Sequence, residues 1–515
     1  MTLAGTLRAL LAAVAGAATV FGFAPFGLAG VPIVTLALLT AMWLSAASAR
    51  AAARLGFAFG LGLFGAGTSW VYIALNTFGG MPMLVALLGT AIWCAYLALF
   101  PALVGWLSTR WTAPGSLPRA VAAAALWTLA EWARGSGYTG FPWLALGYSQ
   151  LAPLATAAVS PLAGYAPMGG VWLVTLAVAL CAGALALAVD AFAASMRARG
   201  FALLLGGAAI AGGGALLAAI EWTAPVGAPV AVSLVQGNVA QDVKFQPGMR
   251  EDTFKLYTDL VSASRGRLIV LPESAFPVFA DEMPDAVLRH LLRTAAARNG
   301  DVLAGMFTAE PPLPGRDEVR YYNSVVTLGA GAVQLYRKRH LVPFGETIPL
   351  KPVVGWFIRS VLAIPLADQT PGDPAPPPLA VAGQSVAVNI CYEDAFGGEL
   401  RAQAAEATLL VNVTNDAWYG RSLAAEQHNQ IAAMRALESG RPLLRATNTG
   451  ITSAIGHDGR ELARLPWFTR GILEVEITGR RGATPYVRWG DALAATAAAA
   501  LLAAALLAAR RRPRH

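Results

Sequence analysis

The sequence predicts a polytopic α-helical membrane bundle of about eight spans joined to a layered α/β domain. Only 13% of the 515 residues are charged, whereas a soluble domain carries roughly 25%. Between residues 222 and 486, short β-branched runs alternate with helical stretches, which is the pattern of a layered α/β sheet. We therefore expect a seven-helix transmembrane region over residues 1–221, a polar domain over 222–486, and a last transmembrane helix with a basic tail over 487–515.

Eight apolar segments are long enough to cross about 30 Å of hydrocarbon as helices. They lie near residues 8–24, 27–46, 55–75, 83–107, 118–134, 168–189, 200–220 and 490–509. The first segment has an alternative interpretation as a cleavable signal peptide, with Ala15-Gly16-Ala17 as its cleavage site. In that case six spans would precede the polar domain.

Arginines predict the orientation of the spans, because they gather on alternate connections while the opposite connections are almost free of Lys and Arg. Arg134 and Arg488 are the exceptions. The clusters are Arg8, Arg50 with Arg54, Arg110 with Arg119, Arg197 with Arg199, and the tail from Arg510 to Arg514. By the positive-inside rule both termini are cytoplasmic, and seven spans put residues 222–486 on the far side, in the periplasm of a Gram-negative cell.

The net charge of +8 is unevenly distributed. Residues 222–486 hold 25 basic and 26 acidic side chains, so the positive excess lies at the ends of the apolar segments. A nucleic-acid-binding patch would lie on the polar domain instead, which excludes that class of function. Two of the three cysteines, Cys94 and Cys181, lie inside apolar segments, so no disulfide framework is predicted.

One outer connection has an unusual composition. Glu131 and Arg134 end the fifth span, and Gly140-Phe141-Pro142-Trp143 follows. An interfacial aromatic belt with a re-entrant loop explains the aromatic residues. A carboxylate at membrane depth also indicates function, with Arg134 as its partner. Both interpretations stay open at this point.

In the polar domain we expect strands near residues 230–236, 268–271, 302–307, 323–328, 333–336, 386–390, 408–413 and 450–455, and helices near 250–264, 286–298 and 423–439. A proline-rich loop covers residues 371–378. The apolar run Val353–Leu366 is predicted to dip into the bilayer, with Trp356 and Phe357 as anchors. Ordinary packing in the core is the alternative for that run.

Cys391 is the first candidate for chemistry. It ends the apolar run Val386–Ile390 and precedes Tyr392, Glu393 and Asp394, so its thiol lies at a junction between a strand and a turn. A structural buried cysteine is the alternative, because free cysteine is among the most buried residue types. The adjacent carboxylates favour a nucleophile.

Glu273 and Lys338 are the other two candidates. Glu273 follows the buried run Leu268–Leu271, at a strand end where ligands bind in α/β sheets. The chain uses Arg 34 times and Lys four times, yet Lys338 lies between two arginines. This choice indicates a compact ammonium at 338 and leaves open whether it releases its proton; an ordinary loop glutamate at 273 and a chance lysine at 338 are the alternatives.

Other ways of activating Cys391 have less support. A Cys–His pair would need a histidine such as His340, which the sequence does not exclude. Neither HExxH nor paired-cysteine spacing occurs, so we expect no metal, and the absence of GxxxxGK[ST] argues against a nucleotide loop.

With Glu273, Lys338 and Cys391 in this order, the polar domain resembles the nitrilase (carbon–nitrogen hydrolase) superfamily, and the whole chain resembles the apolipoprotein N-acyltransferase family. The motifs are Gln236-Gly237-Asn238, Pro272-Glu273-Ser274, Tyr322-Asn323-Ser324, Lys338, His340–Glu346, Cys391-Tyr392-Glu393, Asn415–Gly420 and Gly140–Trp143. This resemblance implies an αββα sandwich and a Glu–Lys–Cys triad: Glu273 as base, Lys338 stabilising thiolate and oxyanion, and Cys391 as nucleophile.

The resemblance also implies the supporting residues and the substrates. The supporting positions are Glu346, Glu393, Tyr392, Asn323, Trp418 and Phe245, the last standing where the family often has Trp. An acyl chain would pass from a phospholipid, typically phosphatidylethanolamine, through a cysteine thioester to the α-amine of a diacylglyceryl-cysteine apolipoprotein. No cofactor is implied, and we expect a monomer in the bacterial inner membrane. The alternatives are a membrane-anchored nitrilase or amidase and a transporter with an inactive domain.

Overall fold

The computed structural model describes residues 3–136, 140–151, 159–241, 244, 247–312, 319–343, 345–347 and 368–510. Two compact units can be described separately. The helical unit comprises the chain up to Tyr72, Met83–Glu221 and the segment from Thr484. The α/β unit comprises Trp222–Ala483 together with Ile73–Pro82, which includes the end of the third predicted span (55–75) and the connection after it. Phe245 and Val353–Leu366 lie outside the described residues.

Each predicted span contains a helix. The helices are α1 (Leu3–Thr19), α2 (Gly30–Leu44), α3 (Ala49–Gly67), α5 (Met83–Trp111), α6 (Leu117–Arg134), α7 (Ala166–Ala193), α8 (Arg197–Ala218) and α15 (Ala492–Arg510), with the short α4 (Val71–Ile73) and α14 (Pro485–Trp489) between them. Five helical segments of the described chain are long and apolar enough to cross a membrane. The number rises to six if α3 and the bent segment that follows it are counted as one span. The two other predicted spans do not meet this standard, because α2 has only 15 residues, about 22 Å, and α6 carries three charged side chains.

Glycines allow the helices of this unit to approach closely. A Cβ atom at Gly16 of α1 would collide with the Phe59 carbonyl of α3, and one at Gly60 of α3 would lie 2.7 Å from Ala98 of α5. Small residues at such crossings let helix backbones pack tightly, which is how helices associate in a membrane.

The connection after α6 is buried within the helical unit. Glu131 accepts hydrogen bonds from Trp127 Nε1 (2.8 Å), the Leu146 amide (3.1 Å) and Thr175 Oγ1 (2.9 Å), while Arg134 donates to the Phe141 and Trp143 carbonyls. The side chains of Phe141 and Trp143 are buried, so they do not form an interfacial belt. Glu131 and Arg134 instead hold the described part of this connection, at Phe141, Trp143 and Leu146.

The α/β unit contains two six-stranded sheets. The first has the order β13-β2-β3-β4-β5-β6 and the second β12-β11-β10-β9-β8-β7, while β1 (Thr223–Pro225) pairs with β14 (Arg480–Gly482). The strands of the first are β13 (Gly471–Ile477), β2 (Val230–Gln236), β3 (Leu268–Val270), β4 (Asp301–Glu310), β5 (Arg320–Gly329) and β6 (Leu335–Arg337). Those of the second are β12 (Glu461–Arg464), β11 (Ser453–Ile455), β10 (Leu443–Thr447), β9 (Leu409–Thr414), β8 (Gln384–Ile390) and β7 (Leu379–Val381).

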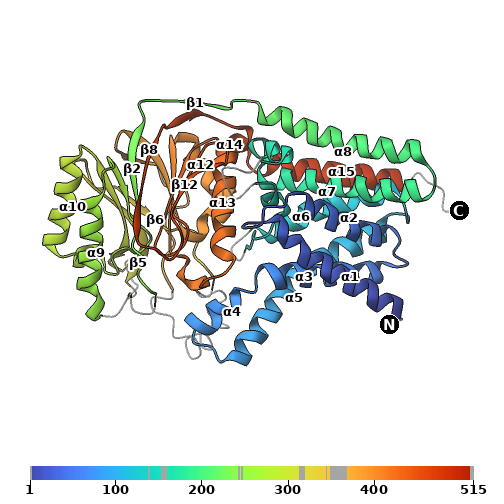
Figure 1. The fold of residues 1–515 in the computed structure, drawn as a ribbon, viewed down its shortest axis with the longest axis horizontal. Helices are drawn as coiled ribbons and strands as arrows, with labels where there is room; N and C mark the ends of the chain where they lie inside the picture. Colours follow the sequence, from blue (N-terminus) through green and yellow to red (C-terminus); the bar gives the residue numbers. More distant parts are fainter. Residues whose placement is uncertain are drawn as a thin grey trace. The chain divides into compact units, whose positions relative to one another are not determined.

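Helices cover the outer faces of the two sheets. In Figure 1, α9 (Arg250–Ala263) and α10 (Asp285–Ala297) lie outside the first sheet, and α12 (Gly397–Glu406) and α13 (Ala424–Ser439) lie outside the second. Apolar side chains such as Tyr257, Leu291 and Ile269 form the core between α9, α10 and the first sheet. The fold class predicted from the sequence, an α-helical bundle with an αββα sandwich, is therefore confirmed.

The strand β10 was missed by the sequence analysis. Arg445 lies in the middle of its five residues and hides the apolar alternation that marks a strand. All five residues are buried, and β10 pairs in parallel with β9 in the second sheet. This strand brings Arg445 beneath the candidate site.

Candidate active site

The three candidate catalytic residues follow the ends of three strands. Glu273 follows β3 and Lys338 follows β6 in the first sheet, whereas Cys391 follows β8 in the second. Lys338 Nζ lies 3.5 Å from Glu273 Oε1. Glu273 and Lys338 also exert the strongest electrostatic effects on the Cys391 thiol, so facing sheets contribute to one site.

The Cys391 backbone has an uncommon conformation. Its φ angle is +55°, in the left-handed region that a non-glycine residue rarely adopts, and it starts the short 3₁₀ turn Cys391–Ala395. Asn412 Nδ2 donates a 3.2 Å hydrogen bond to the Cys391 carbonyl. Backbone strain of this kind gathers at functional sites, where the surrounding structure maintains it.

The environment keeps the Cys391 thiol protonated. Burial and the neighbouring carboxylate of Glu273 raise its pKa above the usual range, while Lys338 works in the opposite direction. A nucleophilic thiolate therefore requires a base at the moment of reaction. Among the charged groups that act on the Cys391 thiol, the Glu273 carboxylate has the strongest effect.

Lys338 is held as an ammonium. Its side chain is 1% exposed, and its Nζ lies 2.7 Å from Glu346 Oε1. Burial opposes the charge, but attraction by Glu346, Glu273 and a Cys391 thiolate outweighs it and raises the pKa of Lys338 above its usual range. The surroundings of this lysine therefore favour the charged form over release of its proton, because a second carboxylate lies next to it.

One side-chain amide and one side-chain amine hold Glu273 in place. Asn323 Nδ2 donates to Glu273 Oε1 over 2.7 Å, and the buried Lys244 Nζ donates to the Glu273 carbonyl over 3.2 Å. Glu346 is held in turn by the Val342 amide, which donates to its Oε2 over 2.9 Å. The sequence analysis named Asn323 and Glu346 but did not single out Lys244.

Glu393 connects the lysine segment to the cysteine turn. It accepts four hydrogen bonds, from Tyr336 Oη (2.8 Å), the Arg339 amide (2.8 Å), the His340 amide (3.1 Å) and the Ile390 amide (2.6 Å). Its carboxylate is thus occupied by structural donors. Because these donors lie next to Lys338 and Cys391 in the chain, Glu393 fixes the positions of both residues.

Two of the aromatic candidates, Tyr392 and Trp418, are described, and each packs against another ring. Tyr392 packs edge-on against Phe396, with ring centroids 5.1 Å apart, and the half-buried Trp418 packs edge-on against Phe78 at 5.7 Å. His340, the alternative partner for the thiol, stacks on Phe396 at 3.6 Å, and its Nδ1 lies 2.9 Å from Glu399 Oε1. The described contacts therefore assign His340 to Glu399. Among the described residues, no group of three His, Cys, Asp or Glu side chains is arranged to hold a metal ion.

A buried ionic cluster beneath the cysteine turn was also missed by the sequence analysis. Its members are Asp394, Asp416, His428 and Arg445, here called the Asp–His–Asp–Arg cluster. In the sequence analysis Asp394 is named only as a neighbour of Cys391, and His428 is not named there at all. Asp394 and His428 lie far in sequence from the residues that they contact, so no local pattern connects them. Asp394 drew attention only because it is close to Cys391 in the sequence.

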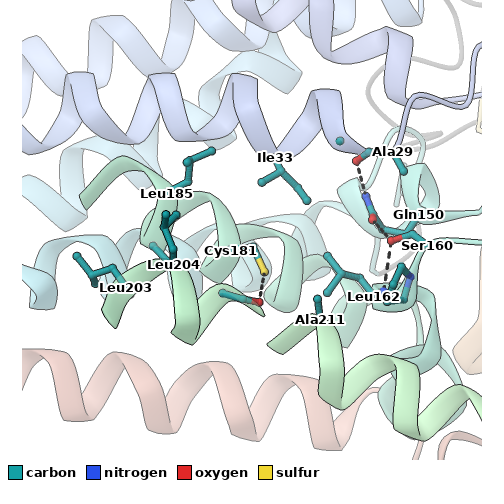
Figure 2. Close-up of a pocket in the computed structure, with 14 residues that line it drawn as sticks. Ala29, Ile33, Gln150, Ser160, Leu162, Cys181, Leu185, Leu203, Leu204 and Ala211 are labelled. Carbon is teal, nitrogen blue, oxygen red and sulfur yellow. Dashed lines mark hydrogen bonds between the residues drawn. The ribbon is translucent and has the colours of Figure 1, made fainter. Parts of the chain in front are cut away.

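The helical unit holds an apolar cavity of about 360 Å³. Side chains of α2, α7 and α8 line it, including Ile33, Leu185 and Leu204 (Figure 2). At one end Ser160 Oγ donates to Gln150 Oε1 over 2.7 Å, and Gln150 Nε2 donates to the Ala29 carbonyl over 3.1 Å. These polar groups therefore satisfy one another at this end of the cavity.

Comparison with known proteins covers nearly the whole chain. The family described as apolipoprotein N-acyltransferase N-terminal domain matches residues 15–184, and the family described as carbon-nitrogen hydrolase matches residues 232–486. A protein named apolipoprotein N-acyltransferase from Nitrosomonas europaea is 48% identical over 95% of this chain and 95% of its own length. One of the same name from Methylococcus capsulatus is 43% identical over 94% of this chain and 92% of its own length.

Proposed function

The chain belongs to the apolipoprotein N-acyltransferase family, and from that premise we propose that it transfers an acyl chain from a membrane phospholipid, through a thioester on Cys391, to the N-terminal amine of a diacylated apolipoprotein. It is an acyltransferase that acts in lipoprotein N-acylation. The proposed donor is phosphatidylethanolamine. The observation that carries the proposal is the meeting of Cys391, at a positive φ, with the buried Glu273–Lys338 pair.

In the first half-reaction, Glu273 removes the Cys391 proton and the thiolate sulfur attacks the ester carbonyl of the phospholipid. A carbon–sulfur bond forms, and the carbonyl electrons move to an oxyanion. The Lys338 ammonium stabilises both the thiolate and the oxyanion, and each well-placed donor is worth roughly 3 kcal/mol in such sites. The oxyanion then collapses, the carbon–oxygen bond breaks, and Glu273 returns the proton to the departing lysophospholipid alkoxide.

In the second half-reaction, the unprotonated α-amine of the apolipoprotein attacks the thioester carbonyl. Glu273 takes one proton from the attacking nitrogen, the carbon–sulfur bond breaks, and the proton returns to the Cys391 thiolate. The products are an amide and the free thiol. Glu346 contributes by keeping Lys338 charged and fixed, because its Oε1 lies 2.7 Å from Nζ in the described structure.

The arrangement in the cell follows from the same reasoning. The family and the apolar helices indicate a bacterial membrane protein. We propose that residues 1–221 and 487–515 lie in the inner membrane, with both termini cytoplasmic, and that residues 222–486 form a periplasmic catalytic domain. Because both substrates are lipids, a catalytic domain attached to the membrane at both ends keeps the thiol near them.

The test is mass spectrometry of the purified full chain after incubation with phosphatidylethanolamine vesicles. We expect one acyl adduct, on Cys391, that disappears when a diacylated lipopeptide is added and reappears as an amide on that lipopeptide. Cys181→Ser is the matched control, since Cys181 lies in the helical unit, and it should keep the adduct. Loss of the adduct in Cys181→Ser, or free fatty acid as the product despite the lipopeptide, would contradict acyl transfer through Cys391.

A further inference from the structure

The Asp–His–Asp–Arg cluster is closed and fully buried. His428 Nε2 lies 2.9 Å from Asp394 Oδ1, and His428 Nδ1 lies 2.7 Å from Asp416 Oδ1. Arg445 completes the ring, with Nη1 2.8 Å from Asp394 Oδ2 and Nη2 3.2 Å from Asp416 Oδ2. The four side chains are at most 1% exposed, so water does not screen them.

The four residues come from four different elements around the nucleophile. Asp394 belongs to the 3₁₀ turn that begins at Cys391, and Asp416 begins the 3₁₀ turn that contains Trp418. His428 lies on α13 and Arg445 on β10. The cluster therefore ties both turns to a helix and a central strand.

A second path connects the cluster to Cys391. Arg445 Nη1 also donates to Asn412 Oδ1 over 2.6 Å, and Asn412 Nδ2 donates to the Cys391 carbonyl over 3.2 Å. The Cys391 turn is therefore held at the Cys391 carbonyl through Asn412 and at its fourth residue through the Asp394 side chain. A shift of the cluster would move the nucleophile.

The charges of the cluster balance only when His428 is protonated. The charged groups that act on its imidazole are Asp394 from the Cys391 turn, Asp416 from the Trp418 turn and Arg445 from β10. Burial and Arg445 oppose a positive charge on His428, but the two carboxylates outweigh them and raise its pKa to about 9. With a neutral imidazole, two buried carboxylates would face a single guanidinium, and unpaired buried charge is strongly unfavourable.

We propose that His428 is a positioning residue for the nucleophile: as an imidazolium it binds Asp394 and Asp416 together, and so it holds Cys391 in its left-handed backbone conformation and the Trp418 turn beside it. His428 does not touch the reacting atoms in this proposal. The measurement of acyl transfer in the test below rests on the proposed function. The positioning of the Cys391 turn by His428 depends only on the fold.

The test compares His428→Gln with the double variant His428→Gln, Asp394→Asn, both in the full chain in phosphatidylethanolamine vesicles. The single variant leaves one excess buried negative charge, whereas the double variant restores the balance. A misplacement of about 1 Å costs on the order of 10²-fold in rate, so we expect His428→Gln to form the Cys391 thioester about 100-fold more slowly at pH 7. With Asp394→Asn added, we expect the double variant to form the thioester at least about tenfold faster than His428→Gln alone. A role of His428 in packing alone does not predict this rescue.

Alkylation of Cys391 by iodoacetamide gives a readout that does not require acyl transfer. We expect the same order of reactivity: wild type, then the double variant, then the single variant. If wild type forms no thioester, the proposed function fails while this comparison still tests the positioning of Cys391. The proposal is overturned if the single variant stays within about twofold of wild type, or if the double variant is no faster than the single one.

A measurement on wild type covers the case in which the single variant does not fold. In histidine-selective NMR we expect one imidazole to stay protonated up to about pH 9, and thioester formation to decline with the same midpoint. Titration of every histidine near pH 6.5, or a rate that keeps rising through pH 10, would overturn the proposal.

Discussion

Replacing Lys338 by Arg separates the role of a compact ammonium from that of positive charge alone. Arginine keeps the charge, so a purely electrostatic role predicts a mild effect. The Lys338 side chain is 1% exposed, and its Nζ lies between Glu346 Oε1 at 2.7 Å and Glu273 Oε1 at 3.5 Å. A guanidinium is larger and planar, and it spreads its charge over three nitrogens. It does not fit between the two carboxylates without moving them.

The size of the effect follows from these contacts. Displacing a catalytic group by about 1 Å costs on the order of 10²-fold, and losing one oxyanion donor costs about 10²–10³-fold in comparable sites. The two losses concern the same ammonium and are not multiplied. We therefore expect at least about a 100-fold loss of acyl transfer, equivalent to about 2.7 kcal/mol of transition-state stabilisation.

The assay is thioester formation on Cys391 from labelled phosphatidylethanolamine, with expression and membrane insertion measured in parallel. Lys255→Arg is the matched control, because Lys255 is 75% exposed on α9 and pairs only with the exposed Asp259 among the described ion pairs. It should keep the wild-type rate. Near-normal thioester formation in Lys338→Arg would contradict a need for a compact ammonium and remove Lys338 from the proposed triad.

Four other expectations concern topology, membrane contact, reactivity and stability. A reporter fused after His515 should report the cytoplasm, and one inserted near Pro376 should report the outer compartment; both on one side would contradict the orientation inferred from the arginines. Spin labels at 356 and 357 should be accessible to lipid-soluble quenchers, and protection from them would end the prediction that this run enters the bilayer. Alkylation of Cys391 should accelerate without reaching a midpoint up to about pH 9, where His428 loses its charge, because burial and Glu273 raise the pKa of the Cys391 thiol; a midpoint near pH 8.5 would indicate an ordinary exposed cysteine. Although burial opposes its charge, Asp394 and Asp416 raise the pKa of His428 from 6.5 to about 9. Its protonation therefore contributes roughly 3 kcal/mol to the free energy of unfolding, fully present below pH 6.5 and lost as the pH rises through about 9. Calorimetry that finds no such decline relative to His428→Gln would exclude this contribution.

Local patterns determined the elements and the strand ends of this protein. The apolar segments predicted the helices because each needs about 20 apolar residues in a row, and α5 and α7 follow that rule. Strands β2 and β3 were visible as buried runs, so Glu273 could be placed at a strand end from its neighbours in sequence. Lys338 stood out because the chain otherwise prefers arginine.

Only the tertiary structure decided which groups meet and what charge they carry. The pKa of Lys338 is raised because Glu346 lies 2.7 Å from its Nζ, and the sequence analysis, which lacked that distance, left proton release open. Glu393 took a bracing role from donors on β6 and β8. The Asp–His–Asp–Arg cluster was not foreseen at all, because its members span residues 394–445 and carry no shared spacing. Sequence patterns report periodic burial, whereas an ionic network depends on distances of a few ångströms between elements that only packing brings together.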